Sequence, residues 1–435
     1  MFDLQEESEF YELNYEANLM NSFLSLASDL KSGVLNPTEV DPFINVKPNE
    51  IDIESLLIRL NDQSNITQII YDFAPKTLEY TRLLLELEKL KKISVDQDWG
   101  DLIPENQILG FKLVHENVRY LRNRLYKMGY LTFNSLSNLY DLELKSAVQL
   151  FQADHGLNDD GVAGNYTIQA LNIPPETRLM QVAVNLERIR WDNAPPTKKQ
   201  IIVNQPNFHA YLFEDSEIKW QSRVVIGLPE HQTKEFTDLM THMIVNPVWH
   251  VPRSISIEEY LPILQEDPEF LKDNDMRLIV RGTKKDIDVN LIDMKQFEPN
   301  NFPFEIKQNP SNINALGVVK FMFPNKYNIY MHDTPMKELF FKDERAFSHG
   351  CVRVQDPFQF AFQLLSEQEN DPQGKFQKVL NTKQETQINL VEAIPIKIVY
   401  RTVFFGDYGQ PQYRADVYGR DALVYMSLSD AGVST

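Results

Sequence analysis

Cysteine, positive charge and long apolar runs are all scarce in this sequence, and each shortage excludes a class of structure. Its 435 residues contain one cysteine, Cys351, so no internal disulfide can form and a metal site built from several thiolates is excluded. Lys and Arg total 43 against 62 Asp and Glu, and the resulting net charge of -19 disfavours binding to nucleic acid or anionic lipid. No apolar run reaches the roughly 18 residues that a membrane-spanning helix needs.

The first residues are acidic, whereas a secretory signal is basic and then apolar. Either the protein stays inside the cell, or the sequence begins after a removed signal. A chain of 435 residues exceeds the size of one hydrophobic core, so we expect two or three domains. Hydrophobic residues make up 43% of the chain, which is enough to fill several cores.

The N-terminal part is expected to be helical. Apolar residues recur at helical spacing in residues 19–27 and 83–90, and a further amphipathic helix is expected in residues 178–191. We therefore predict a helical scaffold over residues 1–108, completed by residues 173–195. No residue of this scaffold carries a recognisable chemical role.

Residues 109–172 predict a small three-helix unit. Helices are expected to stop at Gly129 and Gly156, and Asp160 and Gly161 mark a turn before the third helix. This pattern resembles the peptidoglycan-binding module of many wall enzymes. Because the matching positions are mostly core and turn residues, they indicate the fold rather than sugar binding. His155 lies at a helix end, where we expect it to bond last-turn carbonyls, and we assign it no ligand.

Strands are concentrated in the C-terminal half. Short β-type runs are expected at residues 201–203, 210–213, 220–226, 243–245, 327–332 and 396–405. Between them, residues 253–316 form a polar insertion with helical fragments at 257–264 and 269–271. A lid over a site and a plain surface excursion are both open readings of this insertion.

The chemistry of the chain is expected around Cys351. A lone cysteine is usually an inert buried side chain, and it becomes a nucleophile only where a base or positive field favours the thiolate. His332 ends the expected strand 327–332 on the same face as Tyr330. His332 alone fits a structural role. Followed by fifteen residues and then Ser348-His349-Gly350-Cys351 with Arg353, it forms a joint pattern that chance rarely supplies.

This joint pattern resembles the L,D-transpeptidase catalytic domain of the YkuD type. Other segments agree, including Asn246-Pro247 with Trp249 and Leu316-Gly317 with Lys320. Together with the preceding parts, they resemble the YcbB-like group, which joins a helical scaffold, a peptidoglycan-binding module and a catalytic domain with a capping insertion. The resemblance implies an α+β multidomain protein whose mostly-β catalytic domain spans residues 196–435, with the insertion at 253–316.

The resemblance also implies catalytic roles. Cys351 corresponds to the nucleophile and His332, rather than the nearer His349, to its general base. Asp333 corresponds to the residue whose backbone carbonyl orients the base, although its carboxylate is an open alternative. We expect His349 to support the loop, and the N–H groups of Gly350 and Cys351 to be oxyanion donors, because charge develops beside the nucleophile.

Further residues are expected to contact the substrate. Arg353 would hold a substrate carboxylate or take part in a structural ion pair. Tyr330, Asn246 and Trp249 are expected as walls of the pocket, with core packing as the stronger alternative for Trp249. Ser348 completes the expected substrate-binding set.

The implied reaction is acyl transfer between peptidoglycan stems without a metal or cofactor. Cys351 would release D-alanine from a tetrapeptide stem, and the side-chain amine of another stem would open the thioester to give a 3-3 cross-link. Carboxypeptidase or thiol amidase action on muropeptides and a non-catalytic wall-binding role are the alternatives. By resemblance we expect a periplasmic or cell-envelope location behind a removed signal, carbapenem-type inhibitors, and wall synthases or hydrolases as partners.

Overall fold

The computed structural model describes residues 2–62, 65–96, 99–105, 107–192, 197–406 and 409–433. The chain divides into two compact units, one formed by Met1–Pro196 with Tyr400–Thr435 and the other by Thr197–Val399. The expected boundary between residues 195 and 196 lies outside the described residues, as does Met1. Within the described residues, no helix is long and apolar enough to cross a membrane.

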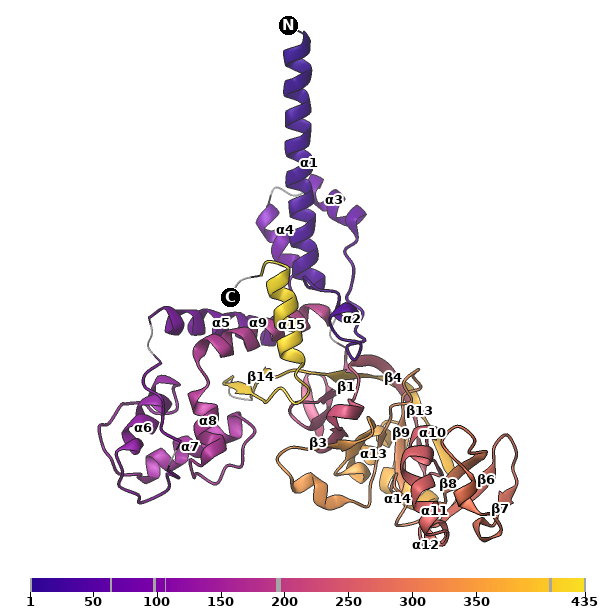
Figure 1. Cartoon of the computed structure of the whole chain (residues 1–435). Helices are drawn as coiled ribbons and strands as arrows, with labels where there is room; N and C mark the ends of the chain where they lie inside the picture. Colours follow the sequence, from indigo (N-terminus) through magenta and orange to yellow (C-terminus); the bar gives the residue numbers. More distant parts are fainter. Residues whose placement is uncertain are drawn as a thin grey trace. The chain divides into compact units, whose positions relative to one another are not determined.

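The first unit is built mainly from helices, as predicted (Figure 1). Leu83 and Leu90 of one helix meet Leu179 and Val182 of another in a shared apolar core. Apolar residues at helical spacing produce this contact, because they line the facing sides of both helices. The elements outside the three-helix module are α1 (Phe2–Ser32), α2 (Pro37–Val40), α3 (Ile53–Asp62), α4 (Ile66–Phe73), α5 (Leu78–Val95), α9 (Pro175–Trp191), β14 (Val403–Phe405), β15 (Pro411–Tyr413) and α15 (Arg420–Asp430).

The three-helix module is confirmed as α6 (Asn117–Lys127), α7 (Leu142–Asp154) and α8 (Asn165–Asn172). Asp141 caps α7 by accepting a hydrogen bond from the N–H of Leu144, which satisfies one of the free donors of the first turn. Gly129 and Gly156 both follow helix ends with φ values of 88° and 67°, a region that glycine adopts without strain. The turn residues therefore set the helix lengths that the sequence predicts.

Residues 400–435 differ from the prediction, which assigned them to the catalytic domain. They belong to the helical unit, where the side chain of Asn185 donates to Thr402 Oγ1 at 2.7 Å and accepts from the Thr402 N–H at 3.0 Å. Arg420 is fully buried and stacks over the rings of Tyr400 and Tyr418. The expected strand at 396–405 is accordingly split, because β13 (Thr386–Val399) ends before β14 begins.

The second unit is organised around a sheet with strand order β11-β3-β12-β10-β9-β4-β13-β1-β2. Strand β3 also pairs with β2, so the sheet closes on itself. Phe360 of α13 stacks on Trp220 and contacts Phe321, which fixes this helix against the sheet. The remaining bounds are β1 (Lys199–Asn204), β2 (His209–Glu214), β3 (Glu217–Gly227), β4 (Phe236–Val245), β9 (Val319–Met322), β10 (Met331–His332), β11 (Ala346–Ser348), β12 (Val352–Val354), α13 (Pro357–Leu365) and α14 (Pro372–Leu380).

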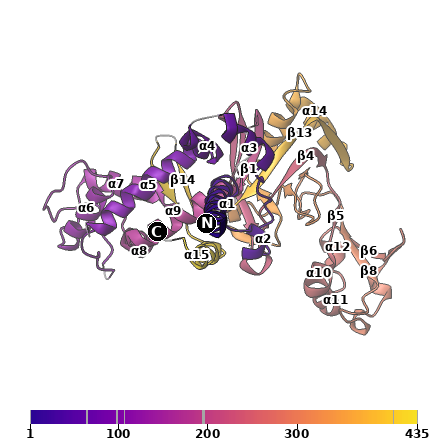
Figure 2. The ribbon, with the colours of Figure 1, turned by 90° about the horizontal axis from the view of Figure 1, so that it is seen from above.

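The insertion has its own sheet and core. Its strands follow the order β5-β8-β6-β7, and its helices cover that sheet in a separate lobe of the unit (Figure 2). The expected helical fragments are present, but the sequence analysis missed these strands. The elements are β5 (Trp249–His250), α10 (Arg253–Ile255), η2 (Ser256–Tyr260), α11 (Leu261–Glu266), α12 (Phe270–Asp273), β6 (Met276–Val280), β7 (Asp286–Ile287), η3 (Val289–Leu291), η4 (Met294–Gln296) and β8 (Phe304–Gln308).

The expected strand at residues 327–332 is mostly wrong. Only Met331 and His332 pair as a strand, β10. Before them, the Asn325 side chain accepts hydrogen bonds from the N–H groups of Tyr327 and Ile329 and donates to the Ile329 carbonyl. An asparagine that bonds nearby backbone favours a turn over a ladder. The apolar alternation of these residues favoured a strand in the sequence analysis, so this turn was not expected.

Candidate active site

The strand register places the predicted catalytic residues on one face of the sheet. His332 on β10 lies opposite Arg353 on β12 and opposite Lys320 on β9. Laterally paired residues point to the same face, so these three side chains form a row. Their neighbours Met331, Val352 and Phe321 point to the other face and are fully buried. The buried row holds the strands in place, and the polar row lines the site.

Cys351 is two residues before Arg353, so its side chain points to the same face of the sheet as Arg353 and His332. The N–H of Val352 donates to the carbonyl of Tyr330 at 3.0 Å, which sets Cys351 beside Tyr330. The Cys351 thiol is half-buried, and its Sγ lies 3.7 Å from the carbonyl oxygen of Asn328. Partial burial raises the pKa of this thiol, and hydrogen bonds from Tyr330 and the charges of Arg353 and Lys320 offset only part of that rise.

His332 is buried and oriented by backbone. Its Nδ1 lies 2.5 Å from the carbonyl oxygen of Asp333, and its ring centre is 5.6 Å from that of Tyr330. A carbonyl can only accept, so Nδ1 carries the proton and Nε2 presents a lone pair. Burial, together with the charges of Arg353, Lys320 and Lys337, lowers the pKa of His332 to about 3.

The sequence left open whether the backbone carbonyl or the carboxylate of Asp333 contacts His332. In the structure the carbonyl makes this contact, and the carboxylate has other partners. Its Oδ1 accepts from Lys337 Nζ at 2.5 Å, and its Oδ2 accepts from the N–H of Val318 at 3.0 Å. Lys337 begins η5 (Lys337–Phe341), five residues after His332, the last residue of β10. In this geometry the carbonyl of Asp333 contacts the imidazole, while its carboxylate anchors the segment that carries the carbonyl.

Arg353 has no carboxylate partner among the described residues. Its NH1 contacts the sulfur of Met336 at 3.5 Å, and its Nε is buried without a hydrogen bond. Burial lowers the pKa of this guanidinium, and the nearby charges of Cys351 and Glu338 act in the opposite direction. Within the described residues, Arg353 thus makes no ion pair with a carboxylate.

His349 contacts the insertion rather than the nucleophile. Its Nε2 lies 2.6 Å from Oε1 of Glu259 in η2, and its ring centre is 5.0 Å from that of His231. Both members of the pair are partly exposed, with side-chain exposures of 37% for His349 and 46% for Glu259. This pair is a direct link between the segment before Cys351 and the insertion.

The N–H of Gly350 is already engaged, which differs from its expected part in an oxyanion hole. It donates to Ser348 Oγ at 3.1 Å, and the Ser348 hydroxyl donates in turn to the carbonyl of Cys351 at 2.6 Å. Gly350 has a φ of 106°, and its carbonyl accepts from Thr233 Oγ1 at 2.9 Å. Ser348 and Gly350 therefore shape the turn, and the Cys351 N–H is left as the oxyanion candidate of the pair.

Trp249 and Asn246 both make structural contacts. Trp249 is only 8% exposed and lies in the core of the insertion, with its ring 6.2 Å from that of Tyr260. The Asn246 side chain donates to the carbonyls of Val379, Leu380 and Gln384. Tyr330, which packs against the same core as Trp249, lies beside Cys351.

Two residues of the site escaped the sequence analysis. Sequence alone assigns no role to Lys320, because its place beside His332 depends on strand register. Glu259 lies 90 positions from its partner His349 and has no local signal. Among the described residues, no group of three His, Cys, Asp or Glu side chains is arranged to hold a metal ion.

Comparison with known families agrees with this geometry. Residues 198–376 match the family model described as "L,D-transpeptidase catalytic domain". The chain therefore carries a YkuD-type L,D-transpeptidase catalytic domain. Residues 114–171 match the model described as "Putative peptidoglycan binding domain", and residues 3–87 match a "Scaffold domain". The resemblance seen in the sequence is confirmed, with the peptidoglycan-binding domain ahead of the catalytic one.

One curated relative is similar over most of the chain. A Haemophilus influenzae protein named "Putative L,D-transpeptidase" is 29% identical over 345 residues, which cover 77% of this chain and 69% of that protein. L,D-transpeptidase crystal structures from Xylanimonas cellulosilytica and Stackebrandtia nassauensis are 13% and 12% identical, with TM-scores of 0.21 and 0.26. The Xylanimonas match covers 68% of this chain and 99% of the other chain. The Stackebrandtia match covers 69% of this chain and 97% of the other chain.

Proposed function

We propose that this protein cross-links peptidoglycan stems in the cell envelope through an acyl-enzyme on Cys351. The observation that supports the proposal most directly is the shared sheet face of Cys351, His332 and Arg353. A nucleophile, a base with a free lone pair and a cation for a carboxylate are the groups that acyl transfer between peptides needs.

The thiol and the imidazole are expected to rest as a neutral pair. The pKa of Cys351 is raised and that of His332 is lowered, so burial opposes a standing thiolate and imidazolium pair. His332 Nε2 would take the thiol proton as sulfur attacks the carbonyl of the third stem residue. The C–S bond forms, the C–N bond to D-alanine breaks, and the same proton passes to the leaving amine.

The second half of the cycle reverses these steps with a new nucleophile. The side-chain amine of another stem attacks the thioester, gives its proton through His332 and restores the thiol. Arg353 is suited to the terminal carboxylate of the donor stem, because its guanidinium lies on the reacting face beside His332. Lys320 supports this role by adding positive charge on the other side of His332.

Incubation of the purified chain with disaccharide tetrapeptides, read by mass spectrometry, tests the proposal. A cross-linked dimer with loss of one D-alanine supports transpeptidation. Loss of D-alanine without a dimer would assign carboxypeptidase action, and cleavage of ordinary L-peptides would assign a thiol amidase. No turnover, combined with pelleting on wall sacculi, would leave a wall-binding protein without catalysis.

Substitution of Gly317 tests whether the Asp333 carbonyl orients His332. A Cβ at this position would lie 2.2 Å from Oδ2 of Asp333, and Gly317 has a φ of 60°. Gly317→Ala should therefore displace Asp333 and lower the free energy of unfolding by about 1–3 kcal/mol. Turnover should fall at least ~10-fold, because the Asp333 carbonyl no longer fixes the imidazole. Circular dichroism melts and the muropeptide assay measure both effects.

Gly282→Ala is the matched control for this substitution. Gly282 has a φ of 74°, but no atom lies within 4 Å of a Cβ built there. The control should lose about 1 kcal/mol from the left-handed backbone and keep its turnover. Equal loss of turnover in both variants would contradict the role given to the Asp333 contact.

We further propose that the insertion acts as a lid held by the Glu259–His349 pair. Glu259→Gln removes the charge of this partly exposed contact, which is worth about 0.2–1 kcal/mol. Hydrogen exchange across residues 253–266 should accelerate, and KM should rise about two- to fivefold. Glu258→Gln, at the exposed neighbouring position, is the control and should change neither quantity. Unchanged exchange in Glu259→Gln would favour a plain surface excursion.

A further inference from the structure

Lys320 is a second cation on the reacting face, and adding positive charge need not be its whole role. Strand register places it directly opposite His332, on the side away from Arg353. Its Nζ lies 5.8 Å from the ring centre of Tyr330, which lies beside Cys351. The charge of Lys320 also contributes to the low pKa of His332. The base is therefore flanked by two cations within one row of side chains.

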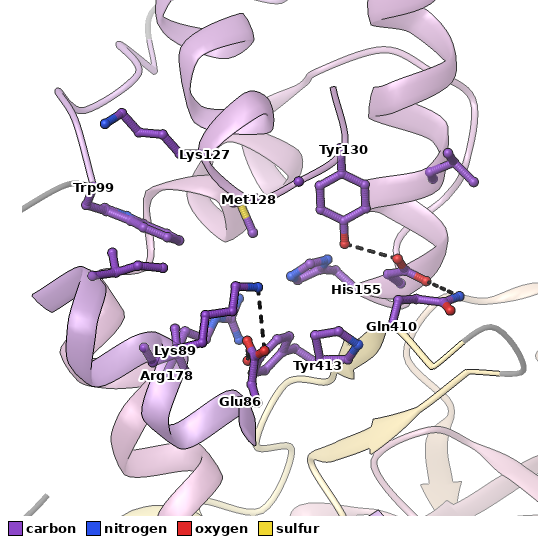
Figure 3. Close-up of a pocket in the computed structure, with 16 residues that line it drawn as sticks. Glu86, Lys89, Trp99, Lys127, Met128, Tyr130, His155, Arg178, Gln410 and Tyr413 are labelled. Atoms are coloured by element: carbon purple, nitrogen blue, oxygen red, sulfur yellow. Dashed lines mark hydrogen bonds and ion pairs between the residues drawn. The ribbon is translucent and has the colours of Figure 1, made fainter. Parts of the chain in front are cut away.

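Lys320 differs from other lysines in its lack of an acid partner. Figure 3 shows the usual arrangement at a cavity of the helical unit, where Lys89 Nζ lies 3.5 Å from Oε2 of Glu86. Among the residues that the structure describes, Lys320 makes no such pair. Glu385 is the acid whose charge acts on it, but Oε1 of Glu385 accepts from the N–H of Val248 at 2.8 Å.

The surroundings of Lys320 favour a bound anion. Burial lowers the pKa of this side chain, while the charges of Glu385 and Cys351 act in the opposite direction. A half-buried ammonium group has lost part of its hydration, and an anion in contact with it replaces that loss. In a peptide substrate the anion available is a carboxylate, which a lysine side chain binds through charge-assisted hydrogen bonds.

The reacting face is covered on the Arg353 side and exposed on the Lys320 side. Val225 on β3 pairs with Arg353 and is fully buried. Beyond Lys320, the paired residues are Ile244 on β4, which is partly exposed, and Gln387 on β13, which is exposed. The donor stem stays attached as a thioester while the acceptor stem enters. The exposed side of the face therefore suits the acceptor.

We propose that Lys320 selects the acceptor stem by binding a carboxylate on the same carbon as the attacking amine. This inference rests on the function proposed above. In that step the acceptor nitrogen bonds to the acyl carbon, the C–S bond to Cys351 breaks, and a proton of the amine passes through His332 to the sulfur. Lys320 would hold the reacting carbon in place, and its charge would favour the neutral amine that attacks.

Two acceptor stems that differ by one carboxylate test this assignment. One has diaminopimelate as its third residue and the other has lysine, so both offer the same side-chain amine. Each is given to the full chain with one tetrapeptide donor whose own side-chain amine is acetylated, and dimer formation is timed by mass spectrometry. The unsubstituted chain should use the diaminopimelate acceptor about 10- to 100-fold more efficiently, the usual gain from a hydrogen bond between charged groups.

Three variants separate the carboxylate contact from other roles of Lys320. Lys320→Met should lose most of the preference, with a rate on the lysine acceptor close to that of the unsubstituted chain. Lys320→Arg keeps the charge and should keep the preference. Lys378→Met removes an exposed lysine of α14 and should behave like the unsubstituted chain. Because Lys320 has no acid partner, Lys320→Met leaves no buried carboxylate unpaired, and its melting temperature should not fall.

The unsubstituted chain decides the question even if a variant fails to fold, because equal use of the two acceptors would overturn the assignment. An equal loss on both acceptors in Lys320→Met would overturn it too. Slower release of D-alanine by Lys320→Met from the donor alone would assign Lys320 to the donor stem instead. That release is also read in the unsubstituted chain. Its absence would overturn the proposed function and this inference with it, whereas release with equal acceptor use overturns this inference alone.

Discussion

Cys351→Ala should abolish release of D-alanine and dimer formation, with a fall in turnover of at least ~1,000-fold, because no other group can form the thioester. The thiol is half-buried and its Sγ lies 3.7 Å from the Asn328 carbonyl oxygen, so its removal should leave the fold intact. Muropeptide products read by mass, with circular dichroism melts of both chains, measure the two expectations.

The same variant also tests where an inhibitor attaches. A carbapenem should add its mass to the unsubstituted chain and not to Cys351→Ala, since Cys351 is the single cysteine of the sequence. Retained turnover in Cys351→Ala would refute the acyl-enzyme on this residue. An adduct on the alanine variant would show that another nucleophile reacts.

His332→Gln should lower turnover by about 100- to 10,000-fold, the usual contribution of a general base. His349→Gln is the matched comparison, because it removes the nearer imidazole, whose contact is with Glu259 of the insertion. We expect His349→Gln to lose less than ~10-fold. Steady-state rates of the three chains on one muropeptide decide between the two histidines. A larger loss in His349→Gln would reverse the assignment of the base.

The pH profile supplies an independent check on His332. Its pKa is lowered to about 3, so protonation that would block the base is confined to pH values near 3 instead of the usual 6.5. Between pH 7 and 5, kcat/KM should therefore stay on a plateau as the pH falls. A fall centred near pH 6.5 that is absent from a His349→Gln chain would show that the other histidine controls the rate.

Local patterns in the sequence predicted the elements that depend on neighbours along the chain. The stops at Gly129 and Gly156 follow from backbone freedom at helix ends, and α6 and α7 of the module end two residues before these glycines. The shared side of Tyr330 and His332 follows from spacing by two, and their rings lie 5.6 Å apart. The roles given to the catalytic residues stay predictions, because the positions of side chains do not show which of them react.

What the sequence could not supply depends on register and on distant contacts. Lys320 lies beside His332 only because β9 and β10 pair at those residues. The Gly350 N–H bonds Ser348 Oγ through a turn whose shape no propensity specifies. The Asn325 turn replaced most of an expected strand, because side-chain bonds to backbone outweighed apolar alternation.

The position of Tyr400–Thr435 within the helical unit has a consequence for biosynthesis. A ribosome must make all of Thr197–Val399 before the segment that contacts Asn185 and buries Arg420 exists. Domains generally fold as units during synthesis, from the N-terminus onward. The catalytic unit can therefore complete its fold while the helical unit, although begun earlier, still waits for its final residues.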